Sequence, residues 1–220
     1  MNSKLIDEGN IFVAIKGLSS DGHDFIDQAI NSGASAIVTN GCDLGPLSVP
    51  QIKVNDTRKA LSAIAAEYYG RPSNDLVVIG ITGTNGKTTT AALTKAILDN
   101  AGHKTAQIGT LGLIADGIDH EKTMTTPDAI SIQKIFHNLR EKSFTHVVME
   151  VSSHALDQNR VADINFNIAA FTNLTPEHLD YHTTIENYFN SKMKLFKNLN
   201  KNSTAIINMK DQYGKKLAKE

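Results

Sequence analysis

The residues best placed to do chemistry lie in a glycine-rich segment near the middle of the chain. Residues 76–90 read LVVIGITGTNGKTTT. The apolar, mostly β-branched residues 76–79 predict a buried strand, and residues 91–98 predict a helix. A glycine loop between a strand and a helix can wrap a polyphosphate, because the free N–H groups of the helix N-terminus point at the bound anion. We therefore expect Lys87 to contact the β- and γ-phosphates of a nucleotide and the Thr88 hydroxyl to reach Mg²⁺.

The glycine spacing in this loop differs from that of the common P-loop. The common pattern places four residues between its first glycine and the Gly-Lys-Thr triplet, which would require a glycine where this chain has Ile81. Gly80 leaves five residues before the triplet and Gly83 leaves two. A strand-to-helix turn with incidental glycines is the alternative interpretation. The strand before the loop and the helix after it favour a phosphate site.

A carboxylate lies near the end of another predicted strand. Glu150 lies near the carboxyl end of the apolar run 147–151, and ligands of open parallel sheets bind beyond that end of the strands. Glu150 is therefore a candidate metal ligand, with a salt bridge or a capping role as the alternative.

The segment 172–182 contains two histidines and an aspartate at alternate positions. The segment has no cysteine and no third histidine nearby, so a zinc site is disfavoured. A hard, oxygen-rich Mg²⁺ site with His178 as its one imidazole fits better beside a phosphate loop. Lys192, in the predicted helix 185–199, would on its own be interpreted as a solvated lysine.

Strands and helices alternate along the chain, which predicts an α/β fold. We expect a small α/β N-terminal domain and then a doubly wound, mostly parallel, P-loop-type domain, joined at a Gly-Arg-Pro-Ser linker at residues 70–73. Thr126 and Pro127 are expected to be the N-cap and first residue of a helix. The predicted strands are 11–15, 36–39, 51–54, 76–79, 105–108, 147–151, 168–172 and 204–208, and the predicted helices are 24–32, 57–69, 91–98, 129–141 and 185–199.

Length and composition suit a globular protein of one or two domains. The chain has 220 residues, a formal net charge of −1 and 40% hydrophobic residues. This charge gives no reason to expect a nucleic-acid partner, and no apolar run approaches the ~18 residues that span a bilayer. Cys42 is the single cysteine, so no internal disulfide can form. With no secretory signal pattern at residue 1, a cytoplasmic location is favoured.

Taken together, these motifs resemble the Mur ligases, and most closely the MurE type, the UDP-N-acetylmuramoyl-tripeptide synthetases of peptidoglycan synthesis. ITGTNGKTT at 81–89 resembles the family's ATP loop, including its departure from the common spacing. TTPD at 125–128 and EVSSHAL at 150–156 are similar to the MurE substrate loops, and TNLTPEHLDYH at 172–182 is similar to the metal-binding segment. NSK at 2–4 stands where the family usually has Asp-Ser-Arg. The ATP loop alone would also fit a folylpolyglutamate synthetase.

The resemblance implies an ATP-dependent amide ligase with ATP and Mg²⁺ as cofactors. It would add meso-diaminopimelate or L-lysine to UDP-N-acetylmuramoyl-L-alanyl-D-glutamate through an acyl phosphate, and the choice between these two amino acids stays open. The implied ATP-binding residues are Gly83, Thr84, Asn85, Gly86, Lys87, Thr88 and Thr89. The implied substrate-binding residues are Ser3, Thr125, Thr126, Ser152, Gln158 and Arg160, with the Asp21–His23 region near the uridine diphosphate. The implied metal ligands are Thr88, Glu150, His178 and a carbamylated Lys192, and the implied catalytic residues are Lys87, Lys192 and His178.

The resemblance also assigns roles to the two predicted domains. Residues 1–73 are expected to bind the UDP-containing substrate, and residues 74–220 to form an incomplete ATP-binding domain. Mur ligases are normally much longer, with a C-terminal amino-acid-binding domain. We therefore expect an N-terminal fragment that does not complete ligation alone and that exposes an unpaired sheet edge. The alternatives are a non-catalytic nucleotide- or UDP-sugar-binding module and a different amide ligase, such as a folylpolyglutamate synthetase.

Overall fold

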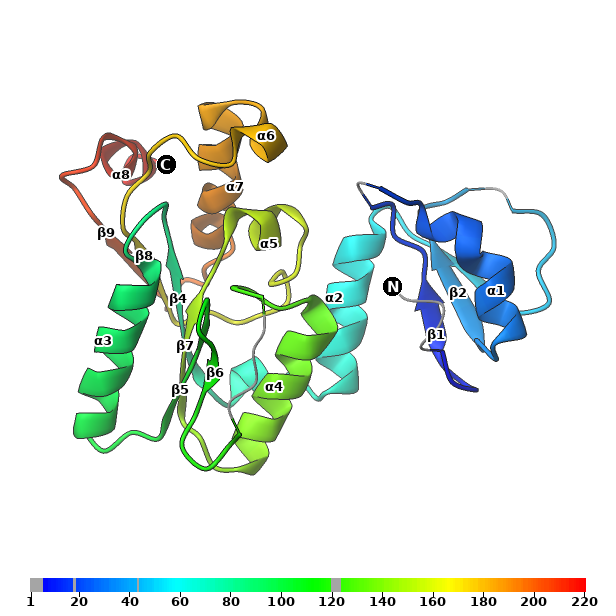
Figure 1. The fold of residues 1–220 in the computed structure, drawn as a ribbon, viewed down its shortest axis with the longest axis horizontal. Coiled ribbons are helices and arrows are strands. Elements are labelled where there is room, and N and C mark those ends of the chain that lie inside the picture. The colour runs from blue at the N-terminus through cyan, green and yellow to red at the C-terminus, as the bar shows by residue number, and fades with distance from the viewer. Residues whose placement is uncertain (1–5, 18, 43, 120–123) are drawn as a thin grey trace. The chain divides into compact units, whose positions relative to one another are not determined.

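The computed structural model describes residues 1–220 except for 1–5, 18, 43 and 120–123 (Figure 1). The chain forms two compact units, residues 1–61 and residues 62–220. The division falls within helix α2 (Thr57–Tyr68), ahead of the predicted linker. The assignment of a UDP-containing substrate to residues 1–73 and of ATP to residues 74–220 stays a prediction.

The first unit is built on a small parallel sheet. Strands β1 (Ile11–Val13), β2 (Ala36–Thr39) and β3 (Gln51–Lys53) pair in the order β1-β2-β3. The predicted helix over residues 24–32 is instead a 3-10 turn, η2 (Gly22–Phe25), followed by α1 (Ile26–Asn31). The buried core of this unit consists of Phe12, Ala14, Ile26, Ala29, Ala34 and Ile37.

The second unit contains a six-stranded sheet in the order β6-β5-β7-β4-β8-β9. All neighbouring strands are parallel except β5 and β6, which are antiparallel. The edge strand β6 was not predicted from the sequence. The strands are β4 (Val77–Thr82), β5 (Thr105–Gly109), β6 (Gly112–Ile114), β7 (His146–Glu150), β8 (Ile168–Phe171) and β9 (Thr204–Ile207).

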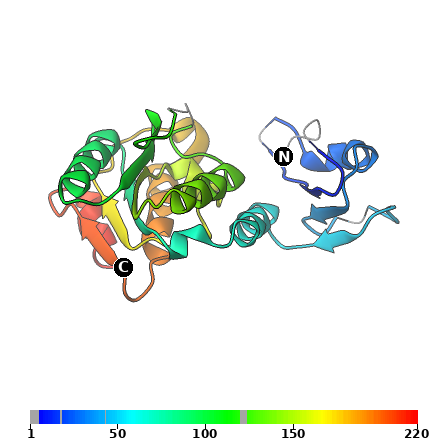
Figure 2. The ribbon, with the colours of Figure 1, turned by 90° about the horizontal axis from the view of Figure 1, so that it is seen from below.

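Helices cover both faces of this sheet, as α3 and α4 show in two views (Figures 1 and 2). Successive residues of a strand point to opposite faces. Accordingly, Val78 packs in the cluster that contains Phe136 of α4, whereas Ile79 packs in the cluster that contains Ala91 of α3. The predicted doubly wound, mostly parallel α/β fold is confirmed. The helical elements are η3 (Pro72–Asn74), α3 (Lys87–Asn100), α4 (Ala129–Glu141), α5 (Ser153–Asp157), α6 (Leu179–His182), α7 (Ile185–Lys197) and α8 (Gln212–Leu217).

Among the described residues, none of the helices combines the length and the apolar character needed to cross a bilayer.

Candidate functional site

The predicted phosphate loop, residues 83–86, joins β4 to α3. Backbone geometry requires glycine at two of its positions. Gly83 has φ 146° and Gly86 has φ 84°, conformations that residues with a Cβ rarely adopt. A Cβ at Gly83 would also collide with the Thr172 hydroxyl. The loop therefore lies directly against the carboxyl end of β8.

The N-terminus of α3 faces this loop. The first hydrogen bond of this helix runs from Thr90 N to Gly86 O, at 2.9 Å. The N–H groups of Lys87, Thr88 and Thr89 precede that bond, so the helix offers them no acceptor, and they carry the positive end of the helix dipole. The side chain of Thr89 is exposed. This arrangement is suited to an anion, as the sequence predicts.

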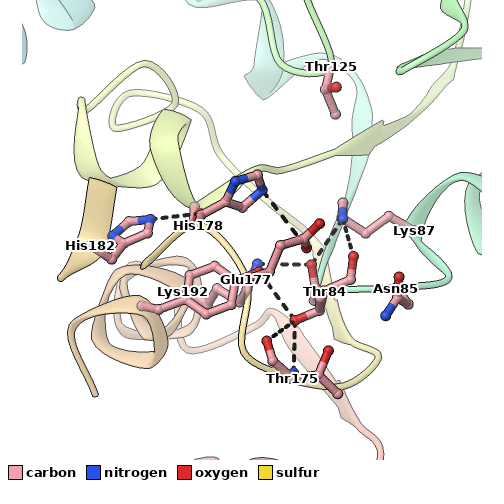
Figure 3. Close-up of polar contacts among 12 residues, drawn as sticks. Thr84, Asn85, Lys87, Thr125, Thr175, Glu177, His178, His182 and Lys192 are labelled. Atoms are coloured by element: carbon pink, nitrogen blue, oxygen red, sulfur yellow. Dashed lines mark hydrogen bonds and ion pairs between the residues drawn. The ribbon is translucent and has the colours of Figure 1, made fainter. Parts of the chain in front are cut away.

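Lys87 is folded back onto the loop that precedes it. Its Nζ donates to Gly83 O at 3.0 Å and to Thr84 O at 2.7 Å (Figure 3). Burial lowers the pKa of the Lys87 amine, and the charge of Glu150 opposes that shift. The amine thus lies within the loop, where a bound phosphate would be enclosed.

Thr84 joins the phosphate loop to a second loop and to α7. Its side chain is buried, and its Oγ1 donates to Thr175 O at 3.2 Å and accepts from Thr175 N at 3.0 Å. The Tyr188 hydroxyl lies 3.2 Å from the same Oγ1. Neither Thr175 nor Tyr188 was predicted as a site residue, because nothing local to positions 175 or 188 marks a contact with the loop.

Asn85 makes a matching set of contacts with the end of β8. Asn85 N donates to Asn173 Oδ1 at 3.0 Å, and Asn85 O accepts from Asn173 Nδ2 at 3.1 Å. Thr172 Oγ1 also donates to Asn85 O, at 2.7 Å. The segment predicted as metal-binding therefore begins as a support for the phosphate loop.

Glu150 and Thr88 are brought together as expected. Thr88 Oγ1 donates to Glu150 Oε2 at 2.9 Å, although the two residues come from α3 and β7. Thr110, just after β5, donates to the same carboxylate through its N–H at 2.9 Å and its hydroxyl at 3.3 Å. Gly109 leaves the space, since a Cβ there would collide with the Glu150 carboxyl group. Thr110 was missed, although its place after a parallel strand was a usable signal.

The side-chain oxygens of Glu150, Thr88 and Thr110 fit a hard cation. A carboxylate and two hydroxyls are oxygen ligands of the kind that Mg²⁺ prefers, and Mg²⁺ is usually held by one or two carboxylates together with substrate phosphates. The residues that the structure describes contain no group of three or more His, Cys, Asp or Glu side chains able to hold a metal. The site therefore suits a magnesium ion that arrives with a nucleotide rather than one caged by the protein alone.

Lys192 is 2% exposed, so the solvated position that its sequence context suggested is wrong. Its Nζ donates to Gly83 O at 2.9 Å and lies 4.4 Å from the centroid of the Tyr188 ring. Burial, together with the charge of Lys87, lowers the pKa of the Lys192 amine to about 7.

His178 directly precedes α6 and has the left-handed backbone angle φ 55°. Its Nε2 is 3.9 Å from Glu177 Oε2, and its ring centroid is 4.9 Å from that of His154 and 6.1 Å from that of Tyr188. The contacts described for His178 are thus with these residues, while Lys192 bonds to the phosphate loop. The predicted joint metal site of His178 and Lys192 stays a prediction.

The predicted substrate residues of the second unit form one network. Thr126 Oγ1 donates to Glu150 O at 2.9 Å and accepts from Ser152 N at 2.9 Å. Arg160 Nη1 donates to Thr126 O at 2.9 Å, and its Nη2 donates to Gln158 Oε1 at 2.8 Å. Thr126 is not the cap of α4, because Asp128 accepts from the first free amides of that helix.

Two further contacts extend this network. Thr125 Oγ1 lies 3.2 Å from Thr110 Oγ1, which links it to Glu150, and Gln158 Nε2 donates to the Tyr181 hydroxyl at 3.3 Å. Tyr181 was not predicted. Ser3 lies outside the described residues. In the first unit, His23 Nδ1 lies 2.6 Å from Asp21 Oδ1, and the buried His23 Nε2 has no hydrogen-bond partner among the described residues.

Two family descriptions match this chain. Residues 81–220 match the Mur ligase middle domain, and residues 1–69 match the Mur ligase family, catalytic domain. A curated relative is the UDP-N-acetylmuramoyl-L-alanyl-D-glutamate–2,6-diaminopimelate ligase of Clostridium botulinum. It is 46% identical over 226 residues, covering 100% of this chain and 45% of the relative.

Solved structures agree with this match. A structure of a ligase with the same name has a TM-score of 0.82 at 27% identity, over 100% of this chain and 44% of that one. MurF ligase of Thermotoga maritima in complex with ADP has a TM-score of 0.57 at 26% identity, over 93% of this chain and 44% of that one. The chain thus spans less than half the length of these relatives. The matched ranges include the loop at residues 83–86 and cover nearly the whole sequence. The chain therefore belongs to the Mur ligase family.

Proposed function

We propose that this chain is the nucleotide-binding part of a MurE-type ligase that adds meso-diaminopimelate to UDP-N-acetylmuramoyl-L-alanyl-D-glutamate. The observation that carries the proposal is the convergence of Lys87, Thr88 and Glu150 at the N-terminus of α3. The name of the Clostridium botulinum relative supports diaminopimelate over lysine. We place the reaction in the cytoplasm, as a step of peptidoglycan synthesis.

The proposed chemistry is amide formation in two steps. The γ-phosphoryl group of ATP passes to the terminal carboxylate of the dipeptide, giving an acyl phosphate and ADP. The amino group of the incoming amino acid then attacks the acyl carbon, and phosphate leaves. The protein would act by holding the reactants in line and neutralising charge, as is usual for phosphoryl transfer.

Each part of the site has a role in this scheme. The free amides of α3 and the Lys87 amine would bind the phosphates of ATP. Thr88 and Glu150 would hold Mg²⁺, which supplies charge neutralisation at the phosphoryl oxygens. Thr126, Ser152 and Arg160 would orient the sugar–peptide substrate beside that centre, since Thr126 bonds to Ser152, to Arg160 and to the Glu150 backbone.

Lys192 fits the carbamylated lysine that the family resemblance implies. A pKa of about 7 leaves much of the Lys192 amine uncharged at neutral pH. Only the uncharged amine can attack CO₂ to form a carbamate, which would turn a buried cation into an oxygen donor. His178 would complete this second metal position.

Calorimetric titration tests the proposal. We expect the chain to bind Mg·ATP and to bind UDP-N-acetylmuramoyl-L-alanyl-D-glutamate in preference to UDP-N-acetylglucosamine and folate. Arg160→Ala should weaken binding of the muramoyl dipeptide by roughly 10- to 100-fold and leave Mg·ATP binding unchanged, because charged hydrogen bonds of this kind contribute about 1.5–3 kcal/mol. The control is Arg140→Ala, whose guanidinium bonds Asp75 and Gly70 instead.

The outcomes separate the alternatives. Binding of Mg·ATP without any response to the muramoyl dipeptide would refute the substrate assignment and favour a generic nucleotide-binding module. Binding of folate in preference to the dipeptide would favour a folylpolyglutamate synthetase.

A further inference from the structure

Tyr188, on α7, is 1% exposed and has its hydroxyl on the phosphate loop. A buried phenol needs a partner for its O–H group. The partner is Thr84 Oγ1, whose single hydrogen is directed to Thr175 O. We therefore assign the Tyr188 hydroxyl as the donor in the 3.2 Å contact with Thr84.

The ring of the same tyrosine backs a buried amine. Lys192 follows Tyr188 by one helical turn, so their side chains share a face of α7. The Lys192 Nζ lies 4.4 Å from the ring centroid, within the range of a cation–π contact. That Nζ also donates to Gly83 O, the residue next to Thr84. One tyrosine thus contacts the loop at Thr84 and the amine that the loop holds at Gly83.

Two amines converge on the Gly83 carbonyl. Lys192 Nζ donates to it at 2.9 Å and Lys87 Nζ at 3.0 Å (Figure 3). Lys87 comes from α3 and Lys192 from α7, so no local helix geometry fixes them together. The peptide between Gly83 and Thr84 therefore carries an acceptor that both amines share.

We propose that Tyr188 is a positioning residue of the phosphate site: its hydroxyl anchors Thr84, and thereby holds the Gly83 carbonyl where it places the Lys87 and Lys192 amines. The inference rests on the proposed function only in taking a nucleotide as the ligand. Without the anchor, the loop gains freedom that nucleotide binding must remove, so affinity falls even though Tyr188 itself need not touch the nucleotide.

The competing explanation is that Tyr188 only fills the core. It belongs to a buried cluster with Phe171, Leu174, Phe189 and Met193. A packing role depends on the ring, which Tyr188→Phe retains. The anchoring role depends on the hydroxyl, which Tyr188→Phe removes. This substitution therefore separates the two explanations.

The first experiment measures acetylation of individual lysines by mass spectrometry in the ligand-free 220-residue chain. In Tyr188→Phe we expect the rates at Lys87 and Lys192 to rise together by about threefold or more, the factor that loss of one hydrogen bond predicts. Lys216, whose Nζ lies 5.0 Å from the Phe189 ring in the same part of the unit, should not change. Tyr213→Phe is the matched control, since Tyr213 also packs against that cluster.

The second experiment is a double-mutant cycle on the affinity for Mg·ATP. Tyr188→Phe should weaken binding about three- to tenfold. Thr84→Val alone should weaken binding more than Tyr188→Phe alone. The double variant should bind about as weakly as Thr84→Val, because that substitution already removes the contact between the two side chains. Tyr213→Phe should bind like the wild-type chain.

Three results would overturn the inference. They are unchanged acetylation at Lys87 and Lys192 in Tyr188→Phe, an equal rise at Lys216, and additive effects in the cycle. If the wild-type chain does not bind Mg·ATP, the proposed function fails, and the acetylation rates still decide the role of Tyr188.

Discussion

At the scale of single residues, the site is set by charges that are buried beside one another. Lys192 lies almost completely out of solvent and near Lys87, so its protonated form is disfavoured and its pKa falls from 10.5 to about 7. At any pH at which the unfolded chain keeps the Lys192 proton, burying this amine lowers the free energy of unfolding. This feature weakens the fold, and it lies at the position where the proposed function requires a reactive amine.

Lys192→Met should remove a pH dependence of stability. Between about pH 7 and pH 10.5 the unfolded state binds the extra proton and the folded state does not. Raising the pH through this window should therefore raise the free energy of unfolding of the wild-type chain relative to Lys192→Met, by up to about 1.4 kcal/mol per pH unit. Urea denaturation at about pH 7, 8 and 9 measures the difference. Lys197→Met, exposed on the same helix, should follow the wild type, and parallel curves for Lys192→Met and wild type would contradict the expectation.

Lys87→Ala should weaken Mg·ATP binding by roughly 10- to 100-fold, because charge-assisted hydrogen bonds contribute about 1.5–3 kcal/mol. Calorimetry gives the affinity, and circular dichroism shows whether the fold is kept. The matched control is Lys95→Ala on the same helix, whose amine pairs with Asp99 away from the loop. Equal losses in the two variants would mean that general charge, and not the position of Lys87, attracts the nucleotide.

At the scale of elements, the sequence predicts what depends on local pattern. The apolar runs that become β4 and β7 are recognisable because buried strands need apolar side chains on both faces. The pairing of Thr88 with Glu150 also follows, since the strand ends of a parallel sheet meet at one edge. The contacts of Thr84 with Thr175 and Tyr188 could not be predicted, because they join segments 91 and 104 residues apart.

The helix cap before α4 shows why a local prediction failed. Thr126 and Asp128 both precede the helix, and either side chain could cap it. The structure gives the cap to Asp128, which accepts from Ile130 N at 3.0 Å and Ser131 N at 3.1 Å. Thr126 is engaged by the end of β7, through Glu150 O. Because the Thr126 hydroxyl bonds to Glu150 O on β7, Asp128 is the residue that caps α4.

Asp128→Ala should lower the free energy of unfolding by about 1 kcal/mol, the usual cost of losing an N-cap. Hydrogen exchange should accelerate at the amides of Ile130 and Ser131, which lose their acceptor. Thr126→Val is the comparison, because it leaves this cap in place and breaks the bonds to Glu150 and Ser152 instead. Faster exchange of the two amides in Thr126→Val, with none in Asp128→Ala, would restore Thr126 as the cap.

At the scale of the whole molecule, the six-stranded sheet presents an edge. Within the described residues, β9 closes the sheet order and pairs with β8 alone. Thr204, Ala205 and Ile206 of this strand are exposed, and Ile206 retains 55% of its accessible surface. An exposed apolar edge strand can pair with the same strand of another molecule. We therefore expect this edge to promote association of the chain at high concentration.

Ile206→Lys should slow the association of this chain severalfold, because a charge on an edge strand opposes strand-to-strand pairing. Light scattering over a concentration series measures the rate. Leu93→Lys is the matched control: Leu93 is 60% exposed, but it lies on α3, where the backbone is already hydrogen-bonded within the helix. If association depends only on exposed apolar surface, the two variants will slow it equally. If it proceeds through strand pairing, Ile206→Lys alone will slow it, and the β9 edge is then the surface through which two copies of this chain meet.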